Sequence, residues 1–168
     1  MPSSLLARCA AAIALALFAC FAPQAFSQCA AGATGSYQFY AGNTFHQTGS
    51  YFGLDWRVRP NIDQPGFMVY GPYDTRFGVG EHRASYYLQV NDITTTPRPV
   101  IASLRVYTRK GGRILAQRDI TRRDFLAANT WQFFTLYFEN PCFEEVETAI
   151  YWHGNAQLVF GQVYISKD

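Results

Sequence analysis

The sequence predicts an all-β domain folded as an antiparallel β-sandwich of about nine strands. Aromatic residues make up 17% of the 168 residues, whereas charged residues make up only 15%. Runs rich in Tyr, Phe, Val and Thr are separated by Gly, Pro, Asn and Asp, which is typical of short strands joined by turns. Helical periodicity is nearly absent, so the chain lacks the crossover helices of an α/β fold, and an antiparallel sandwich or barrel is favoured.

The first element, residues 1–27, has the layout of a cleavable secretory signal. A single cation precedes an apolar stretch over residues 10–22, and small residues lie near Ser27. This stretch of about 13 residues is shorter than the roughly 20 that a membrane-spanning helix needs. We therefore expect cleavage after Ser27 and a single domain, residues 28–168, that is secreted or periplasmic and does not span a membrane. Lipoprotein processing at Cys20 is the alternative.

The charge of the mature domain is close to neutral. The whole chain has a formal net charge of +2, and Arg8 leaves with the signal, which makes +1. Such a domain has no strong positive electrostatic field that would attract nucleic acid or an acidic membrane, so we expect no nucleic-acid partner.

Two cysteines, Cys29 and Cys142, remain after cleavage. In an oxidising compartment two thiols usually pair, so we predict a disulfide between them. In the loop-entropy model, closing a loop of this length stabilises the fold by about 4–5 kcal/mol. Two unpaired thiols are the alternative, and this pair offers too few ligands for a metal.

The strands before residue 82 are expected to be short, at residues 37–40, 54–58 and 67–70. Strict alternation of apolar and polar residues then predicts strands at residues 82–91 and 100–109. Their inward-facing set is Ala84, Tyr86, Leu88, Val90, Leu104 and Val106.

After the turn around Gly111-Gly112, the pattern predicts strands at residues 114–120, 131–139, 146–153 and 158–165. A helical turn fits within residues 121–129, and a β-bulge is expected at a glycine of the last strand. The residues expected to face inward here are Phe134, Leu136, Phe138 and Ile150, with Trp131 and Trp152 also assigned to the core.

A series of short motifs resembles the galactose-binding-like jelly-roll modules found beside bacterial polysaccharide enzymes and glycosyltransferases. The motifs are Tyr70-Gly71-Pro72-Tyr73, Gly80-Glu81-His82-Arg83-Ala84, Ala102-Ser103-Leu104-Arg105-Val106, Ala116-Gln117-Arg118-Asp119-Ile120, residues 134–138, Tyr151-Trp152-His153-Gly154 and Val163. They cover about residues 67–166 in the family's order. The resemblance implies a jelly roll that binds carbohydrate. Structural calcium occurs among related jelly rolls, and no ligands for it can be assigned here.

The first candidate site comprises aromatic and polar residues that alternation places outward. These are Tyr87, Tyr107, Tyr137 and Tyr151, with Arg83, Gln89, Arg105, Thr135 and His153. The C–H faces of sugars pack on aromatic rings and their hydroxyls form hydrogen bonds, so such a face suits a glycan. The alternative is that these tyrosines only cover neighbouring side chains and lie on different sheets.

The second candidate site is a loop end around Trp56, Tyr70, Tyr73 and Asp74, with His46 upstream. Loops on a rigid sandwich commonly carry binding residues. Alternatively, the Tyr-Gly-Pro-Tyr segment is a structural corner.

No nucleophile elbow, phosphate loop or clustered histidine motif is present, and the run Glu144, Glu145 and Glu147 is typical of a solvated edge. We therefore expect no enzyme activity. The favoured function is non-catalytic carbohydrate binding by exposed aromatics on a sheet face or loop rim. A structural or protein-interaction module of the bacterial envelope, with an unknown partner protein, is the alternative. A small polysaccharide hydrolase or lyase is a third.

Overall fold

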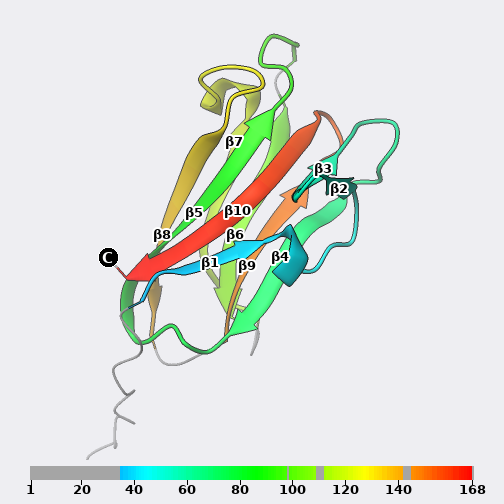
Figure 1. Ribbon diagram of the computed structural model, residues 1–168. Helices are drawn as coiled ribbons and strands as arrows, with labels where there is room; N and C mark the ends of the chain where they lie inside the picture. Colours follow the sequence, from blue (N-terminus) through cyan, green and yellow to red (C-terminus); the bar gives the residue numbers. More distant parts are fainter. Residues whose placement is uncertain (1–34, 98, 109–111, 142–144, 168) are drawn as a thin grey trace, which may run out of the picture.

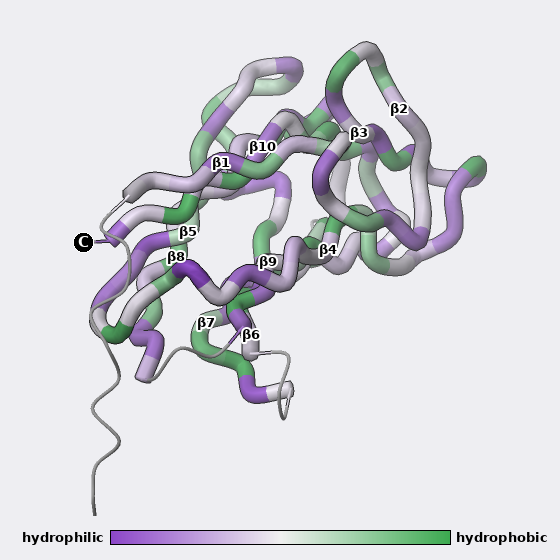
Figure 2. Tube along the Cα trace, turned by 60° about the horizontal axis from the view of Figure 1, so that its bottom comes forward, coloured by the Kyte–Doolittle hydropathy of each residue, from purple (hydrophilic) through white to green (hydrophobic). Residues whose placement is uncertain are grey.

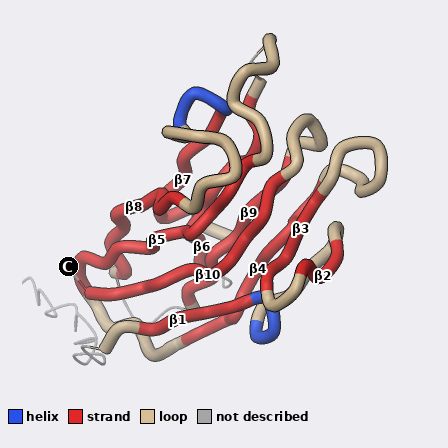
Figure 3. Tube along the Cα trace, turned by 45° about the horizontal axis from the view of Figure 1, so that its top comes forward, coloured by secondary structure: helices blue, strands red, loops and turns tan. Residues whose placement is uncertain are grey.

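The computed structural model describes residues 35–97, 99–108, 112–141 and 145–167, which form two antiparallel sheets packed face to face (Figure 1). The strands are β1 (Tyr37–Tyr40), β2 (Ser50–Phe52), β3 (Asp55–Val58), β4 (Gly66–Asp74), β5 (Gly80–Val90), β6 (Val100–Thr108), β7 (Ile114–Thr121), β8 (Gln132–Asn140), β9 (Val146–Trp152) and β10 (Leu158–Lys167). The helical segments within the described residues are the single turns η1 (Ala41–Asn43) and η2 (Arg122–Asp124), blue in Figure 3.

One sheet has six strands in the order β2-β3-β10-β5-β8, with β1 also paired to β10. The other has four strands in the order β4-β9-β6-β7. From β7 onward the chain passes from one sheet to the other at every connection, so consecutive strands lie in opposite sheets. The fold is therefore the antiparallel jelly-roll sandwich that the sequence predicts.

The core lies between the sheets and is built by the alternation of side chains along each strand. Residues Ala84, Tyr86 and Leu88 are fully buried, as the pattern predicts. The hydroxyl of Tyr86 donates a hydrogen bond across the core to the carbonyl oxygen of Arg105 on the opposite sheet, at 2.6 Å. Figure 2 shows hydrophobic and hydrophilic residues interspersed along the strands, as this alternation requires.

A β-bulge at Gly161 changes which residues of β10 face inward. The register between β10 and β5 shifts between Phe160 and Gln162. Before the shift Leu158 and Phe160 are buried, and after it the buried residues are Val163 and Ile165. The expected bulge is thus confirmed, and it allows both halves of β10 to bury apolar side chains.

Two features of the first half differ from the expectation. Residues 50–52 form a tenth strand, β2, which the sequence does not reveal because three residues beside a turn are too few to show alternation. Strand β4 continues to Asp74 rather than ending at Tyr70, with a register shift between Gly71 and Asp74. The Tyr-Gly-Pro-Tyr segment is therefore an irregular part of a strand and not a corner that ends one.

The other predicted strands are present with ends displaced by at most a few residues, and η2 lies within the region expected to hold a helical turn. The leader, its cleavage after Ser27, and the cysteines Cys20, Cys29 and Cys142 lie outside the described residues. Among the residues that the structure does describe, no helix is long and apolar enough to cross a membrane.

A buried carboxylate fixes the loop that follows β4. Asp74, 8% exposed, accepts hydrogen bonds from the backbone N–H of Arg76 at 2.8 Å and from its Nε at 2.9 Å. The Arg76 guanidinium in turn lies 4.2 Å from the ring centroid of Tyr37 in β1. Burial raises the pKa of Asp74, but the hydrogen bonds from Arg76 outweigh it, so that the net pKa is lowered.

We expect Asp74→Asn to lower the free energy of unfolding by about 1 kcal/mol at neutral pH. Because the folded pKa of Asp74 lies below 3.8, its contribution is present above that pH and is lost as the pH falls through the folded value. Denaturant unfolding of wild type and Asp74→Asn, at about pH 7 and at about pH 3, measures the difference in the free energy of unfolding at each pH. An equal difference between variant and wild type at the two pH values would contradict the assignment.

Candidate functional site

An aromatic stack, defined as Trp131, Tyr87 and Phe133, stands on the outer face of the six-stranded sheet. The Tyr87 ring centroid lies 4.8 Å from that of Trp131 and 4.5 Å from that of Phe133, with interplanar angles of 16° and 29°. Both faces of Tyr87 are therefore covered. Phe133 is 50% exposed and Trp131 lines a hollow, so these two rings form the accessible sides of the stack.

The alternation along β8 places the stack on this face. Phe134 and Leu136 point into the core, so Phe133, and Trp131 two residues before it, point outward. In the register with β5, Tyr87 lies directly opposite Phe133. Cross-strand aromatic neighbours at this distance stabilise a sheet by roughly 0.2–1 kcal/mol.

Gly161 lets the stack approach the sheet closely. A Cβ atom on Gly161 would lie 3.2 Å from a ring carbon of Trp131 and 3.2 Å from a ring carbon of Tyr87. The bulge residue of β10 therefore has a second role beside the change of register, because its missing side chain leaves room for both rings.

Two hollows flank the stack. The first, here called the stack hollow, has a volume of about 290 Å³ and is lined by Tyr40, Leu54, Asp55, Tyr87, Trp131, Gly161 and Gln162. The second, here called the serine hollow, has a volume of about 370 Å³ and is lined by Ser36, Arg83, Ser85, Phe133, Thr135, Tyr164 and Ser166. Together they extend along β5 on either side of Tyr87 and Phe133.

Polar side chains in the hollows are held by hydrogen bonds. Gln162 donates from Nε2 to the hydroxyl of Tyr164 at 2.6 Å and also pairs with Gln38 of β1. Ser85 and Thr135 share a hydrogen bond of 2.9 Å, and Arg83 donates from Nε to Ser166 at 3.0 Å. These bonds fix hydroxyl, amide and guanidinium groups in place beside the aromatic rings.

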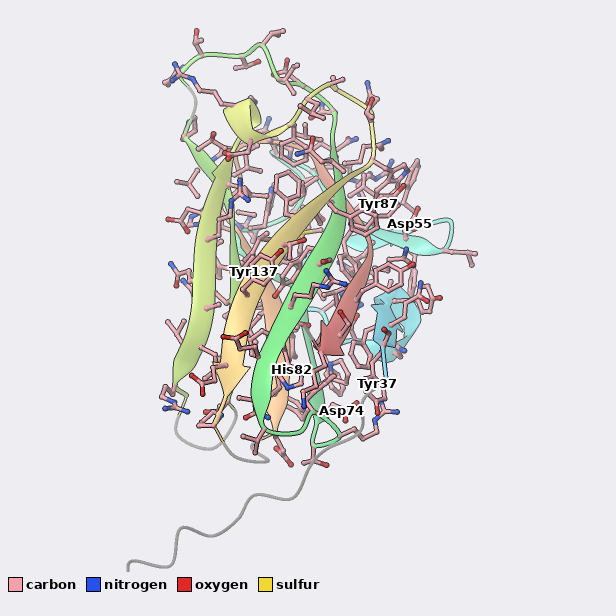
Figure 4. All side chains as sticks on the ribbon, turned by 90° about the vertical axis from the view of Figure 1, so that its left-hand side faces the viewer. Tyr37, Asp55, Asp74, His82, Tyr87 and Tyr137 are labelled. Atoms are coloured by element: carbon pink, nitrogen blue, oxygen red, sulfur yellow. The ribbon has the colours of Figure 1, made fainter. Side chains whose placement is uncertain are left out.

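Asp55 is an exception in the stack hollow, because no hydrogen bond or ion pair to its carboxylate is found among the described residues. Burial raises the pKa of this carboxyl above its ordinary value. Figure 4 shows Asp55 and Tyr87 on the same side of the molecule, with Tyr137 further along the sheet.

The structure divides the predicted tyrosine face between the two sheets. Tyr87 and Tyr137 lie on the six-stranded sheet. Tyr137 lines a separate hollow of about 390 Å³ with Glu81, His82, Phe138 and Glu139, at the opposite end of this face from the stack. The predicted site residues that lie on the four-stranded sheet are Tyr70, Tyr73, Arg105, Tyr107, Tyr151 and His153.

The outer face of the four-stranded sheet carries its own row of rings. Phe67 lies 5.3 Å from Tyr151 and 6.0 Å from Tyr70, and the Arg105 guanidinium lies 6.0 Å from the centroid of Tyr151. Phe45 continues the row beyond Tyr70 at 5.6 Å. The Phe67 ring meets Tyr151 at 87° and Tyr70 at 60°, so that these rings meet edge to face.

Tyr107 belongs to the same face but is partly covered. Burial, together with a hydrogen bond to Glu147, raises the pKa of its hydroxyl. Tyr107 is therefore half-buried, and its hydroxyl is engaged with Glu147.

Two tryptophans lie where the sequence did not place them. Trp131 was assigned to the core but belongs to the aromatic stack on the outer face. Trp56 was assigned to an exposed rim, but His46 covers its ring at 3.7 Å and 14°, and its Nε1 donates to the Thr48 carbonyl at 2.7 Å. Trp152 is fully buried, as expected.

The stack could have been found from the alternation itself. If Phe134 points inward, the same period of two places both Trp131 and Phe133 outward. Sequence reasoning missed Phe133. Gln162 and Asp55 lacked a signal because only the sheet topology places β10 beside β5, and β3 beside β10.

Ser103, Asp119 and His153 meet on the four-stranded sheet but are not arranged as a catalytic triad. The Ser103 hydroxyl donates to Asp119 Oδ1 at 2.6 Å and lies 3.0 Å from His153 Nε2. In a triad the carboxylate would bind the imidazole and leave the serine hydroxyl to the histidine. Within the described ranges, no three His, Cys, Asp or Glu side chains are placed to hold a metal ion.

Comparisons with known proteins find solved structures that are similar to this chain at low sequence identity. No family model matches the sequence, and no curated protein matches it. One similar solved structure contains the CBM22-1 and GH10 modules of endo-1,4-β-D-xylanase 10B from Clostridium thermocellum, complexed with xylohexaose. It is 15% identical with a TM-score of 0.45, and the match covers 82% of this chain but only 27% of that one.

Two further solved structures are matched over nearly their whole length. The C-terminal CBM6 of a marine laminarinase from Zobellia galactanivorans is 10% identical with a TM-score of 0.47, and the match covers 79% of this chain and 100% of that one. A carbohydrate-binding module of lichenase 5A from Cellvibrio mixtus, in complex with cellotriose, is 14% identical with a TM-score of 0.44, covering 80% and 98%. Both of these proteins are carbohydrate-binding modules by name.

We expect Gly161→Ala to displace the aromatic stack without unfolding the sandwich, because the added Cβ atom would lie too close to the two rings. Near-ultraviolet circular dichroism measures the change in the packing of Trp131 and Tyr87. Gly42→Ala is the matched control, since nothing lies within 4 Å of a Cβ atom at that position. Identical aromatic spectra for wild type and Gly161→Ala would contradict this role of Gly161.

Proposed function

We propose that the protein is an exported, non-catalytic carbohydrate-binding module that holds a glycan on the outer face of its six-stranded sheet. The observation that carries the proposal is the aromatic stack of Trp131, Tyr87 and Phe133 between two polar hollows. Binding without turnover is proposed because the carboxylates and the Ser103 cluster form no recognisable catalytic arrangement among the described residues.

The chemistry of this face matches that of a sugar chain. Sugar rings present C–H surfaces that pack against the flat faces of Trp131 and Phe133. Their hydroxyls need donors and acceptors, which Gln162, Arg83 and Ser85 supply in fixed positions. The hollows, of about 290 and 370 Å³, lie at the lower end of the range for small-ligand sites. Together they suit consecutive sugar units of one chain.

The parallel stacking favours this face over the four-stranded sheet. Trp131 and Phe133 stand nearly parallel to Tyr87, so flat ring surfaces remain available on both sides of the stack. On the other sheet, Phe67 meets its two neighbours edge to face, which directs ring faces toward adjacent rings. A sugar ring packs its C–H face on the flat surface of an aromatic ring rather than on the edge of that ring.

We expect Phe133→Ala and Trp131→Ala each to weaken glycan binding by about 5- to 30-fold, equivalent to about 1–2 kcal/mol. A glycan array identifies an oligosaccharide that the exported protein binds, and titration calorimetry then measures affinities for that compound. Tyr151→Ala, on the opposite sheet, is the matched control and should retain the wild-type affinity.

The same variants and assays distinguish the proposed glycan site from the alternative sites and functions. Loss of affinity only in Tyr151→Ala would move the site to the four-stranded sheet. A protein that binds nothing on the array but shows a concentration-dependent mass would favour the structural or protein-interaction module. Release of reducing sugar by the purified protein would instead indicate a hydrolase or lyase.

Export is proposed on the basis of the leader. We expect the protein recovered from the periplasm or medium to begin at Gln28 and to contain a Cys29–Cys142 disulfide. Intact-mass spectrometry before and after reduction checks both points, because reduction of one disulfide adds two hydrogens. Retention of the leader, or a lipid attached at Cys20, would contradict this form of the mature chain.

A further inference from the structure

The stack hollow contains a carboxylate, that of Asp55, for which no hydrogen bond or ion pair is found among the described residues. Along β3, Trp56 faces the core side, so Asp55 faces outward into the hollow. Around it lie the rings of Tyr40, Tyr87 and Trp131, which belong to three different segments of the chain. The topology has therefore gathered one carboxylate and three aromatic rings in a single hollow.

Asp55 is the one charged residue that lines this hollow among the described residues. Arg57, two residues further along β3, places its guanidinium carbon 4.2 Å from the ring centroid of Phe52 and is not part of the lining. Arg83 lines the neighbouring serine hollow, where it is bonded to Ser166. The lining of the stack hollow is therefore negative, and no described cation belongs to it.

An unpaired carboxylate beside aromatic rings is costly, because burial removes water that would solvate the charge. The raised pKa of Asp55 has this cause. A hydroxyl of a neutral sugar would give the carboxylate one hydrogen bond. A ligand ammonium would give it a hydrogen bond and the missing opposite charge, and it would also be attracted to the faces of the aromatic rings.

We propose that the stack hollow selects an amino sugar with a free amine, whose ammonium group pairs with Asp55 against Tyr40 and Trp131. This inference rests on the proposed glycan-binding function and adds the class of sugar. The serine hollow would hold the adjoining unit through its hydroxyl groups. An N-acetylated sugar lacks the charge and is not expected to gain from Asp55.

The experiment compares three β-1,4-linked hexamers, of glucosamine, of glucose and of N-acetylglucosamine, by titration calorimetry at one ionic strength. The pH is kept where the amine is protonated and Asp55 is ionised. We expect the glucosamine hexamer to bind about tenfold more tightly than the glucose hexamer. Asp55→Asn should remove this preference, so that the variant binds the glucosamine and glucose hexamers with about equal affinity.

Glu139→Gln is the matched control for charge. It removes a carboxylate from the same face, but at the far end of β8, roughly 20 Å along the strand from Phe133. This variant should keep the full preference for the glucosamine hexamer. An equal loss of preference in Glu139→Gln and Asp55→Asn would show general attraction to a negative surface and overturn the assignment to Asp55.

The outcomes separate the two proposals. Equal affinity of wild type for the three hexamers, weakened by Phe133→Ala, would overturn the amino-sugar selection and leave the glycan-binding face standing. A preference for the glucosamine hexamer that survives in Asp55→Asn would also overturn the selection. Absence of binding to all three hexamers, together with an empty glycan array, would overturn the proposed function itself.

Discussion

The six-stranded sheet depends on β10, because this strand pairs with β5 along one edge and with β1 and β3 along the other. A regular strand of this sequence would turn one half of its apolar residues to solvent. The bulge at Gly161 changes the facing residues from Leu158 and Phe160 to Val163 and Ile165, so that both halves bury apolar side chains. The core and the outer face are both set by this one local irregularity.

Much of the fold follows from the period of two, whereas the site follows only in part. Alternation predicts the strands and buried sets of β5, β6 and β8 because these strands are long and each has one buried face. It states whether a side chain points in or out, but not which sheet carries it. The outward tyrosines 87 and 107 therefore looked alike in the sequence, although the fold places them on opposite sides of the molecule.

Two errors have definite physical causes. Trp131 is predicted to lie in the core, although the alternation of β8 directs it outward, where one face of its ring packs on Tyr87. The sequence predicts Trp56 at an exposed rim, but His46 stacks on its ring where the chain folds back through β2. In both cases a contact between aromatic rings from different segments decides the position, and such contacts are not visible in the local pattern.

The covered position of Tyr87 also determines how much freedom the site loses when a ligand arrives. Its ring is packed between Trp131 and Phe133, and Gln162 is bonded to Tyr164 and Gln38. Immobilising a flexible side chain on binding typically costs about 0.5–1.5 kcal/mol. The packing of the folded chain already fixes the groups of the stack, so a glycan of the proposed kind would meet a surface that is organised in advance.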